Sequence, residues 1–97
     1  MVKKTYSKTG RSCRVTFKLP EVEAGQIAVL GEFNAWDAAS HPLVRRKDGS
    51  FSTTISLEAG REYRFRYLVD GDEWRNDDAA DALVPNHFGS QDCVLAL

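Results

Sequence analysis

The sequence contains few cysteines, few histidines and no excess of either charge, and each shortage excludes a class of protein. Its 97 residues include two cysteines and two histidines, and the formal net charge is −1. This balanced charge gives no general attraction to nucleic acid or to an anionic membrane. No run approaches the roughly 18 apolar residues that span a bilayer, and the first residues lack the apolar segment of a signal peptide. We therefore expect a cytoplasmic protein with no nucleic-acid partner and no membrane partner.

The two cysteines are too few for a disulfide framework or a zinc site. Cys13 and Cys93 lie near opposite ends of the chain, and we expect both to be reduced thiols in a core. If the first and last strands are neighbours, the two sulfur atoms can also form a disulfide, and the sequence leaves this pairing open.

Motifs of catalysis and cofactor binding are also missing. There is no His-Glu-x-x-His, no Gly-x-Ser-x-Gly, no P-loop and no dinucleotide fingerprint. His41 and His87 are far apart and lack neighbours at metal-ligand spacing. The acidic run that starts at Asp70 has Arg75 where a calcium loop requires glycine. We therefore expect no enzymatic activity, no metal and no cofactor.

Short β-strands with turns between them make up most of the sequence. Residues 12–19 alternate between apolar and polar side chains, and residues 62–69 do so most clearly, with Tyr63, Phe65 and Tyr67 on one face. Other short runs that predict strands are residues 27–30, 43–44, 51–57, 73–75 and 93–97. No amphipathic helix is present.

This pattern predicts an all-β fold, an antiparallel β-sandwich of immunoglobulin-like type with about seven short strands. One domain is expected over residues 12–97. Residues 1–11 carry several basic side chains and are expected to form a frayed N-terminal arm. Residues 76–91 show neither a helical nor a strand period, so we expect a long loop there.

Two tryptophans lie outside the alternating strands. Trp36 is in a polar segment after the 27–30 strand, and Trp74 follows the turn Asp70-Gly71-Asp72. An aromatic ring among polar residues offers a flat apolar face with a polar edge, which suits the C–H face and the equatorial hydroxyls of a sugar. Either ring can instead close the end of the sandwich, so the tryptophans point to a sugar site or to core packing.

Longer motifs surround both tryptophans. They are Gly31-Glu32-Phe33-Asn34-Ala35-Trp36-Asp37, His41-Pro42-Leu43, Phe65-Arg66-Tyr67-Leu68-Val69-Asp70-Gly71 and Phe88-Gly89-Ser90. In combination they resemble family-48 carbohydrate-binding modules. These modules include the glycogen-binding domain of AMP-activated kinase β subunits and the N-terminal early-set domains of isoamylases and branching enzymes. The likeness runs from about Cys13 to Leu97, and the combination of motifs is more specific than any one of them.

The resemblance implies a β-sandwich that binds α-1,4-linked glucans (glycogen, starch and maltooligosaccharides) on a surface site. By motif position, the carbohydrate-binding residues would be Trp36, Arg66, Trp74, Phe88, Ser90 and Asp92. The tryptophans would stack on glucose rings, and Phe88 would press into the curve of the glucan. Arg66 stands where kinase-associated members carry a lysine that hydrogen-bonds sugar hydroxyls. Ser90 and Asp92 match polar contacts.

Departures from the family pattern accompany these matches. Asp92 stands where asparagine is usual, so the donor of an amide is lost. The turn before Trp74 is one residue longer, which puts the position of that ring in question. Phe33 is expected to pack inward, and Asn34 is expected to fix the loop that presents Trp36.

Two functions of different classes stay open. The leading hypothesis is a non-catalytic module that binds α-glucan by aromatic stacking. The alternative is an early-set protein-interaction module, which packs against a glucan-metabolising enzyme or a kinase subunit without binding sugar itself.

Overall fold

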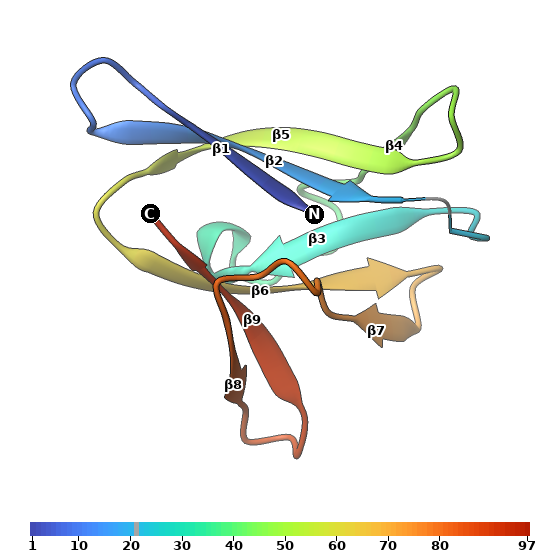
Figure 1. Cartoon of the computed structure of the whole chain (residues 1–97). Coiled ribbons are helices and arrows are strands. Elements are labelled where there is room, and N and C mark those ends of the chain that lie inside the picture. Colours follow the sequence, from blue (N-terminus) through green and yellow to red (C-terminus); the bar gives the residue numbers. More distant parts are fainter. Residues whose placement is uncertain (21) are drawn as a thin grey trace.

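Two antiparallel β-sheets pack face to face in the computed structural model, which describes residues 1–20 and 22–97 (Figure 1). The four-stranded sheet has the order β1-β2-β5-β4, with β1 Val2–Tyr6, β2 Ser12–Leu19, β5 Phe51–Glu58 and β4 Val44–Arg45. The five-stranded sheet has the order β3-β6-β9-β8, with β3 Ile27–Gly31, β6 Glu62–Val69, β9 Gln91–Ala96 and β8 Ala82–Pro85; β7 Glu73–Arg75 also pairs with β6. A short 3-10 helix, η1 Glu32–Asn34, follows β3. The predicted all-β sandwich is confirmed. Within the described residues, no helix has the length and apolar character needed to cross a membrane.

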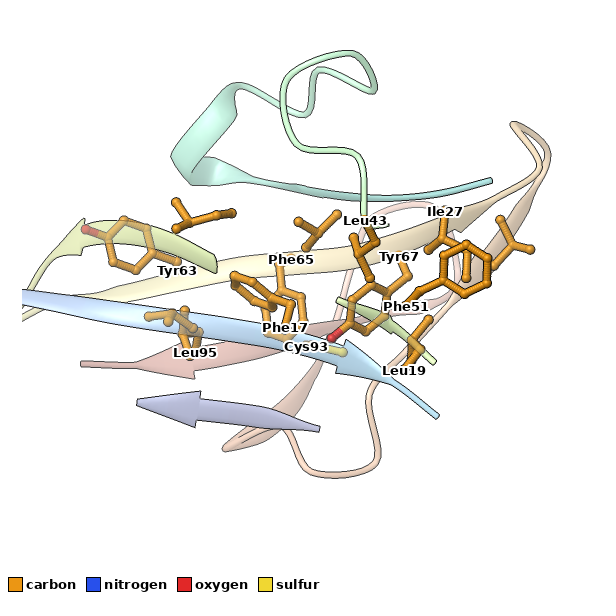
Figure 2. Close-up of a cluster of buried hydrophobic side chains, with 14 of the residues drawn as sticks. Phe17, Leu19, Ile27, Leu43, Phe51, Tyr63, Phe65, Tyr67, Cys93 and Leu95 are labelled. Atoms are coloured by element: carbon orange, nitrogen blue, oxygen red, sulfur yellow. The ribbon is translucent and has the colours of Figure 1, made fainter. Parts of the chain in front are cut away.

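Alternating side chains on β2 and β6 build the core between the sheets. On β6, Tyr63, Phe65, Tyr67 and Val69 are buried, and the residues between them point to the outer face. Phe17 of β2 meets them from the other sheet, with its ring centroid 5.1 Å from that of Phe65. Figure 2 shows these side chains in the layer between the strands. Full burial of one such side chain stabilises the fold by about 1.5–3 kcal/mol relative to exposure.

Both edges of β6 are paired, and this organises the five-stranded sheet. β3 runs along one edge. The other edge is shared between two strands: β9 pairs with the first half, as far as Phe65 opposite Cys93, and β7 pairs with the second half, from Tyr67 opposite Arg75. Arg66 therefore lies between the two ladders, near the first residues of β9 and the last residue of β7.

The N-terminal residues differ from the frayed arm that was expected for residues 1–11. Val2–Tyr6 forms β1, which pairs antiparallel with β2. Lys4 also reaches the five-stranded sheet, because its Nζ donates to both carboxylate oxygens of Asp81, at 2.9 and 2.7 Å, and to the carbonyl of Ala96 at 2.9 Å. The sequence did not indicate this strand, because the apolar-polar alternation of an edge strand is weak.

The segment 76–91 also differs from expectation, because it contains β8, Ala82–Pro85, paired with β9. With β1 and β8, the described residues form nine strands rather than about seven. Figure 1 shows the β8–β9 hairpin extending away from the four-stranded sheet. Most of β8 is therefore exposed, and Leu83 keeps 47% of its surface accessible.

Several titratable groups are buried in the core. Cys13 and Cys93 are both free and buried, so they form no disulfide, and burial raises the pKa of the Cys93 thiol. The hydroxyl of Tyr67 donates to Asp77 Oδ2 at 2.8 Å. Burial, together with the adjacent Asp77 carboxylate, raises the pKa of Tyr67 well above its usual value. Cys93 and Tyr67 therefore serve packing and hydrogen bonding in their protonated forms.

Candidate functional site

Side chains on the outer face of the five-stranded sheet line a hollow of about 1170 Å³, called here the outer hollow. All six residues that the resemblance implies as binding residues line it: Trp36, Arg66, Trp74, Phe88, Ser90 and Asp92. They come from the loop after β3, from β6, from β7 and from the β8–β9 hairpin. The fold therefore brings together residues that are far apart in the sequence.

The loop after β3 presents Trp36 to the outer hollow. Ala35 and Trp36 both have left-handed backbone, with φ of 54° and 59°, a conformation that costs non-glycine residues on the order of 1–2 kcal/mol each. Asn34 offsets this cost: its Oδ1 accepts from the N–H of Gly31 at 3.0 Å, and its Nδ2 donates to the carbonyl of Val29 at 3.0 Å. The expected role of Asn34 in fixing the loop agrees with these bonds. Trp36 keeps 37% of its surface exposed.

Close packing beneath this loop holds it against β6. Phe33 packs inward, with its ring centroid 5.6 Å from that of Phe17 and 6.1 Å from that of Tyr63. A Cβ atom at Gly31 would lie 2.5 Å from the carbonyl oxygen of Arg64 and 2.8 Å from the ring of Phe33. Only glycine permits this approach, so Gly31 sets how closely the Trp36 loop sits on the sheet.

Trp74 and Arg66 form a pair on the same face. Trp74 lies opposite Leu68 in the β6–β7 register, which turns its ring to the outer face, and 45% of its surface is exposed. The guanidinium carbon of Arg66 is 5.5 Å from the Trp74 ring centroid, and Arg66 Nε donates to Asn76 Oδ1 at 2.8 Å. The longer turn before Trp74 thus still leaves this ring beside Arg66 in the outer hollow.

The β8–β9 hairpin also lines the hollow. Asn86 organises the hairpin loop, because its Oδ1 accepts from the N–H groups of Phe88 at 3.0 Å and Ser90 at 3.1 Å. Phe88 is 83% exposed, and its ring centroid lies 4.2 Å from that of His87. A bare phenylalanine on a fixed loop is a large apolar surface that the fold itself does not cover.

Asp92 is nearly buried, with 8% of its surface exposed. Its Oδ1 accepts from Asn86 Nδ2 at 3.0 Å, and its Oδ2 lies 3.7 Å from Arg64 Nη1. Both carboxylate oxygens thus have protein partners. A carboxylate in place of the usual asparagine serves this arrangement well, since both partners are donors.

The outer hollow also contains residues that sequence reasoning missed: Leu30, Glu32, Arg64, Asn86 and His87. Arg64 could have been found, because it lies two residues before Arg66 on one strand and therefore shares its face. Asn86 and His87 gave no signal, since they follow a strand that the sequence pattern did not predict. Across residues 1–20 and 22–97, no group of three metal-ligating side chains comes together.

The chemistry of the outer hollow suits a ligand with flat apolar faces and many hydroxyl groups. Two half-exposed indole rings and one phenyl ring offer aromatic faces. Arg66 and Ser90 add hydrogen-bond donors beside them, and the serine hydroxyl can also accept.

Comparison with known proteins identifies a family and several relatives, among them two branching enzymes. Residues 13–95 match the family described as the glycogen recognition site of AMP-activated protein kinase. The chain is 46% identical over 43 residues to a 1,4-alpha-glucan branching enzyme of Photobacterium profundum, and 38% identical over 45 residues to one of Aquifex aeolicus. Each match covers 43% of this chain but only 6% and 7% of the respective enzymes, so the similarity concerns a small part of each.

Proposed function

Because the chain belongs to the family of glycogen-recognition carbohydrate-binding modules, we propose that it binds α-1,4-linked glucan in the outer hollow by aromatic stacking. Members of this family are non-catalytic domains, and glucan binding is their general function. The observation that carries the proposal is the gathering of Trp36, Trp74 and Arg66 in one open hollow. Neither indole is buried in the core, so both rings are available for stacking. Arg66 in the same hollow is available for hydrogen bonding.

Stacking would supply most of the binding energy. The C–H faces of glucose are apolar, and an indole ring covers them without the loss of a hydrogen bond. An α-1,4-linked chain is curved, so Trp36 and Trp74 would contact different glucose units while Phe88 presses into the curve. The family resemblance and the exposure of all three rings support this arrangement.

Hydrogen bonds would then orient the sugar. Arg66 uses its Nε on Asn76, and its two Nη groups are the donors proposed for the hydroxyls of one glucose. Ser90 is proposed as a second contact. Asp92 is proposed to act at the site mainly by holding Asn86 and Arg64 in place, because its two oxygens already have those partners.

Affinity for one site should be weak. If each stack contributes about 1–2 kcal/mol and each hydrogen bond to an exposed hydroxyl about 1 kcal/mol, the dissociation constant falls between millimolar and tens of micromolar. Binding to a polymer would be tighter wherever several modules act together, because the effective concentration rises.

A titration of the chain with maltoheptaose, followed by tryptophan fluorescence, tests the proposal. We expect saturation with a dissociation constant in that range and a similar response to β-cyclodextrin. Cellohexaose, which has the same glucose units in β-1,4 linkage, is the control and should bind at least about tenfold more weakly because its chain is straight. No response to millimolar maltoheptaose would refute sugar binding in the outer hollow.

A protein-interaction role is the second candidate. It is favoured by the two relatives, in which the matching segment is part of a 1,4-alpha-glucan branching enzyme. The partner would be a glucan-active enzyme or a kinase subunit, and the chain would pack against it without binding sugar. Gel filtration of the chain with a purified branching enzyme, in the presence and absence of maltoheptaose, distinguishes the two. Co-elution together with a silent sugar titration would favour this second role.

A further inference from the structure

Asn76 joins the two strands that share one edge of β6. Its Oδ1 accepts from Arg66 Nε at 2.8 Å, and its Nδ2 donates to the carbonyl oxygen of Gln91 at 3.1 Å. Asn76 directly follows β7, Arg66 lies on β6, and Gln91 is the first residue of β9. One amide side chain thus connects three strands on the outer face.

The next residue, Asp77, makes a similar connection on the inner face. Its Oδ2 accepts from the hydroxyl of Tyr67 at 2.8 Å and from the amino group of Met1 at 2.6 Å, and its N–H donates to Cys93 Sγ at 3.1 Å. Asp77 is 4% exposed. The buried residue therefore anchors the backbone, so that Asn76 cannot move away from Arg66 without disturbing the core.

This connection lies between two halves of the outer hollow. One half, the tryptophan half, consists of Arg66 and Trp74 on β6 and β7. The other half, the hairpin half, is the β8–β9 loop with Phe88 and Ser90. β7 and β9 follow one another along β6, and the β6–β9 ladder ends at Phe65 opposite Cys93, so this ladder does not extend to Gln91 or to the hairpin loop. The β8–β9 hairpin also extends away from the four-stranded sheet (Figure 1), and its loop is held mainly by the bonds of Asn86 within the hairpin.

We infer that Asn76 is a positioning residue, which fixes the hairpin half of the outer hollow relative to the tryptophan half so that one glucan chain can contact both. The ligand part of this inference rests on the proposed function. It predicts that Asn76 raises the affinity for long oligosaccharides, which span both halves, and has little effect on the affinity for short ones, which occupy one half.

Hydrogen exchange without sugar tests the connection itself. In Asn76→Ala, we expect the amides of residues 86–91 to exchange at least about fivefold faster than in the unchanged chain, because the hairpin loses its bond through Gln91. Asp78→Ala, at an exposed position two residues further on, is the control and should leave these amides unchanged. Unchanged exchange in Asn76→Ala would overturn the inference whatever the sugar does.

Sugar titrations test the effect on the ligand. Asn76→Ala should weaken maltoheptaose binding about fivefold and maltotriose binding less than about twofold. Asn76→Asp keeps the acceptor for Arg66 but loses the donor to Gln91, so it should show the same dependence on length. Arg66→Met keeps the bond to Gln91 and should weaken both sugars alike. An equal loss for both sugars in the Asn76 variants would overturn the positioning role. If the unchanged chain bound neither sugar, the proposed function would fail, and the exchange result would still decide whether Asn76 fixes the hairpin.

Discussion

The inner and outer faces of the five-stranded sheet both carry aromatic rings, but they hold them by different means. On the inner face, Phe65 and Tyr67 are fully buried and meet Phe17 edge to face at 5.1 and 6.5 Å. On the outer face, Trp36 and Trp74 keep 37% and 45% of their surfaces exposed. Packing fixes the inner rings, whereas hydrogen bonds and a neighbouring guanidinium fix the loops and strands that carry the outer ones.

The two faces show how stability and binding can be separated in a small sandwich. Apolar area that is already buried contributes to folding, and apolar area that is still exposed can contribute only when something covers it. The loop that carries Trp36 also has a conformational cost, because Ala35 and Trp36 have left-handed backbone. A local cost of this kind at an exposed aromatic is typical of a binding surface.

A substitution on the inner face should change stability more than any on the outer face. Phe65→Ala should lower the free energy of unfolding by about 3–5 kcal/mol, because it opens a cavity in contact with Phe17 and Tyr67. Urea denaturation followed by circular dichroism measures the loss. Leu68→Ala, on the outer face of the same strand, is the matched control and should cost far less. Similar losses for the two variants would remove the distinction between the faces.

Next in size is the effect of an outer ring on sugar binding. Trp36→Ala should weaken maltoheptaose binding about five- to thirtyfold, since one stack of about 1–2 kcal/mol is lost. Its free energy of unfolding should fall by less than about 1.5 kcal/mol, because the ring is not part of the core. Calorimetric titration and urea denaturation of the same preparation measure both. A variant with a lower free energy of unfolding but unchanged maltoheptaose affinity would contradict the assignment of Trp36 to the ligand.

Phe88→Ala tests the outer face with little effect on the core, because the Phe88 side chain is 83% exposed. Its removal should change the free energy of unfolding by less than about 0.5 kcal/mol, as for other exposed positions. Maltoheptaose affinity should fall about three- to fivefold, since the ring covers only part of one glucose. Calorimetric titration is the measurement. Unchanged affinity would limit the binding surface to the tryptophan half.

Sequence reasoning succeeded where a segment has one buried face and one exposed face. Residues 12–19 alternate strictly and residues 62–69 alternate except at Leu68, so β2 and β6 could be predicted to the residue. The positions of Trp36 and Trp74 outside that pattern left a surface site and core packing both open, and the structure places both rings, partly exposed, in one hollow. The family motifs supplied the six candidate residues, whose contact with sugar stays a prediction.

The missed parts are those that depend on contacts between distant segments. β1 and β8 are edge strands without a fully buried face, so their sequences show no clear period. The role of Asn76 likewise depends on the junction of β7 and β9 along β6, which no local pattern reveals. Composition and spacing report burial along one strand, but they do not report which strands become neighbours.

The last prediction concerns the contact between Lys4 of β1 and Asp81, the residue before β8, which lies outside both aromatic faces. Burial acts to raise the pKa of Asp81, but its hydrogen bonds from Lys4 and from the N–H of Ala96, with the charge of Lys4, outweigh burial and lower that pKa below 3.8. A carboxylate whose pKa is lower in the folded state stabilises the fold above its unfolded value of 3.8, and this contribution is lost as the pH falls through the lower folded value. Asp81→Asn should therefore reduce the free energy of unfolding at pH 7 by at most about 1 kcal/mol, since the pair is partly exposed and screened by solvent. The difference from the unchanged chain should shrink as the pH falls below 3.8, and maltoheptaose affinity at pH 7 should stay the same. Urea denaturation across this pH range is the measurement. A difference that did not change with pH would mean that the contact holds β1 through hydrogen bonding alone, without a contribution from the charge of Asp81.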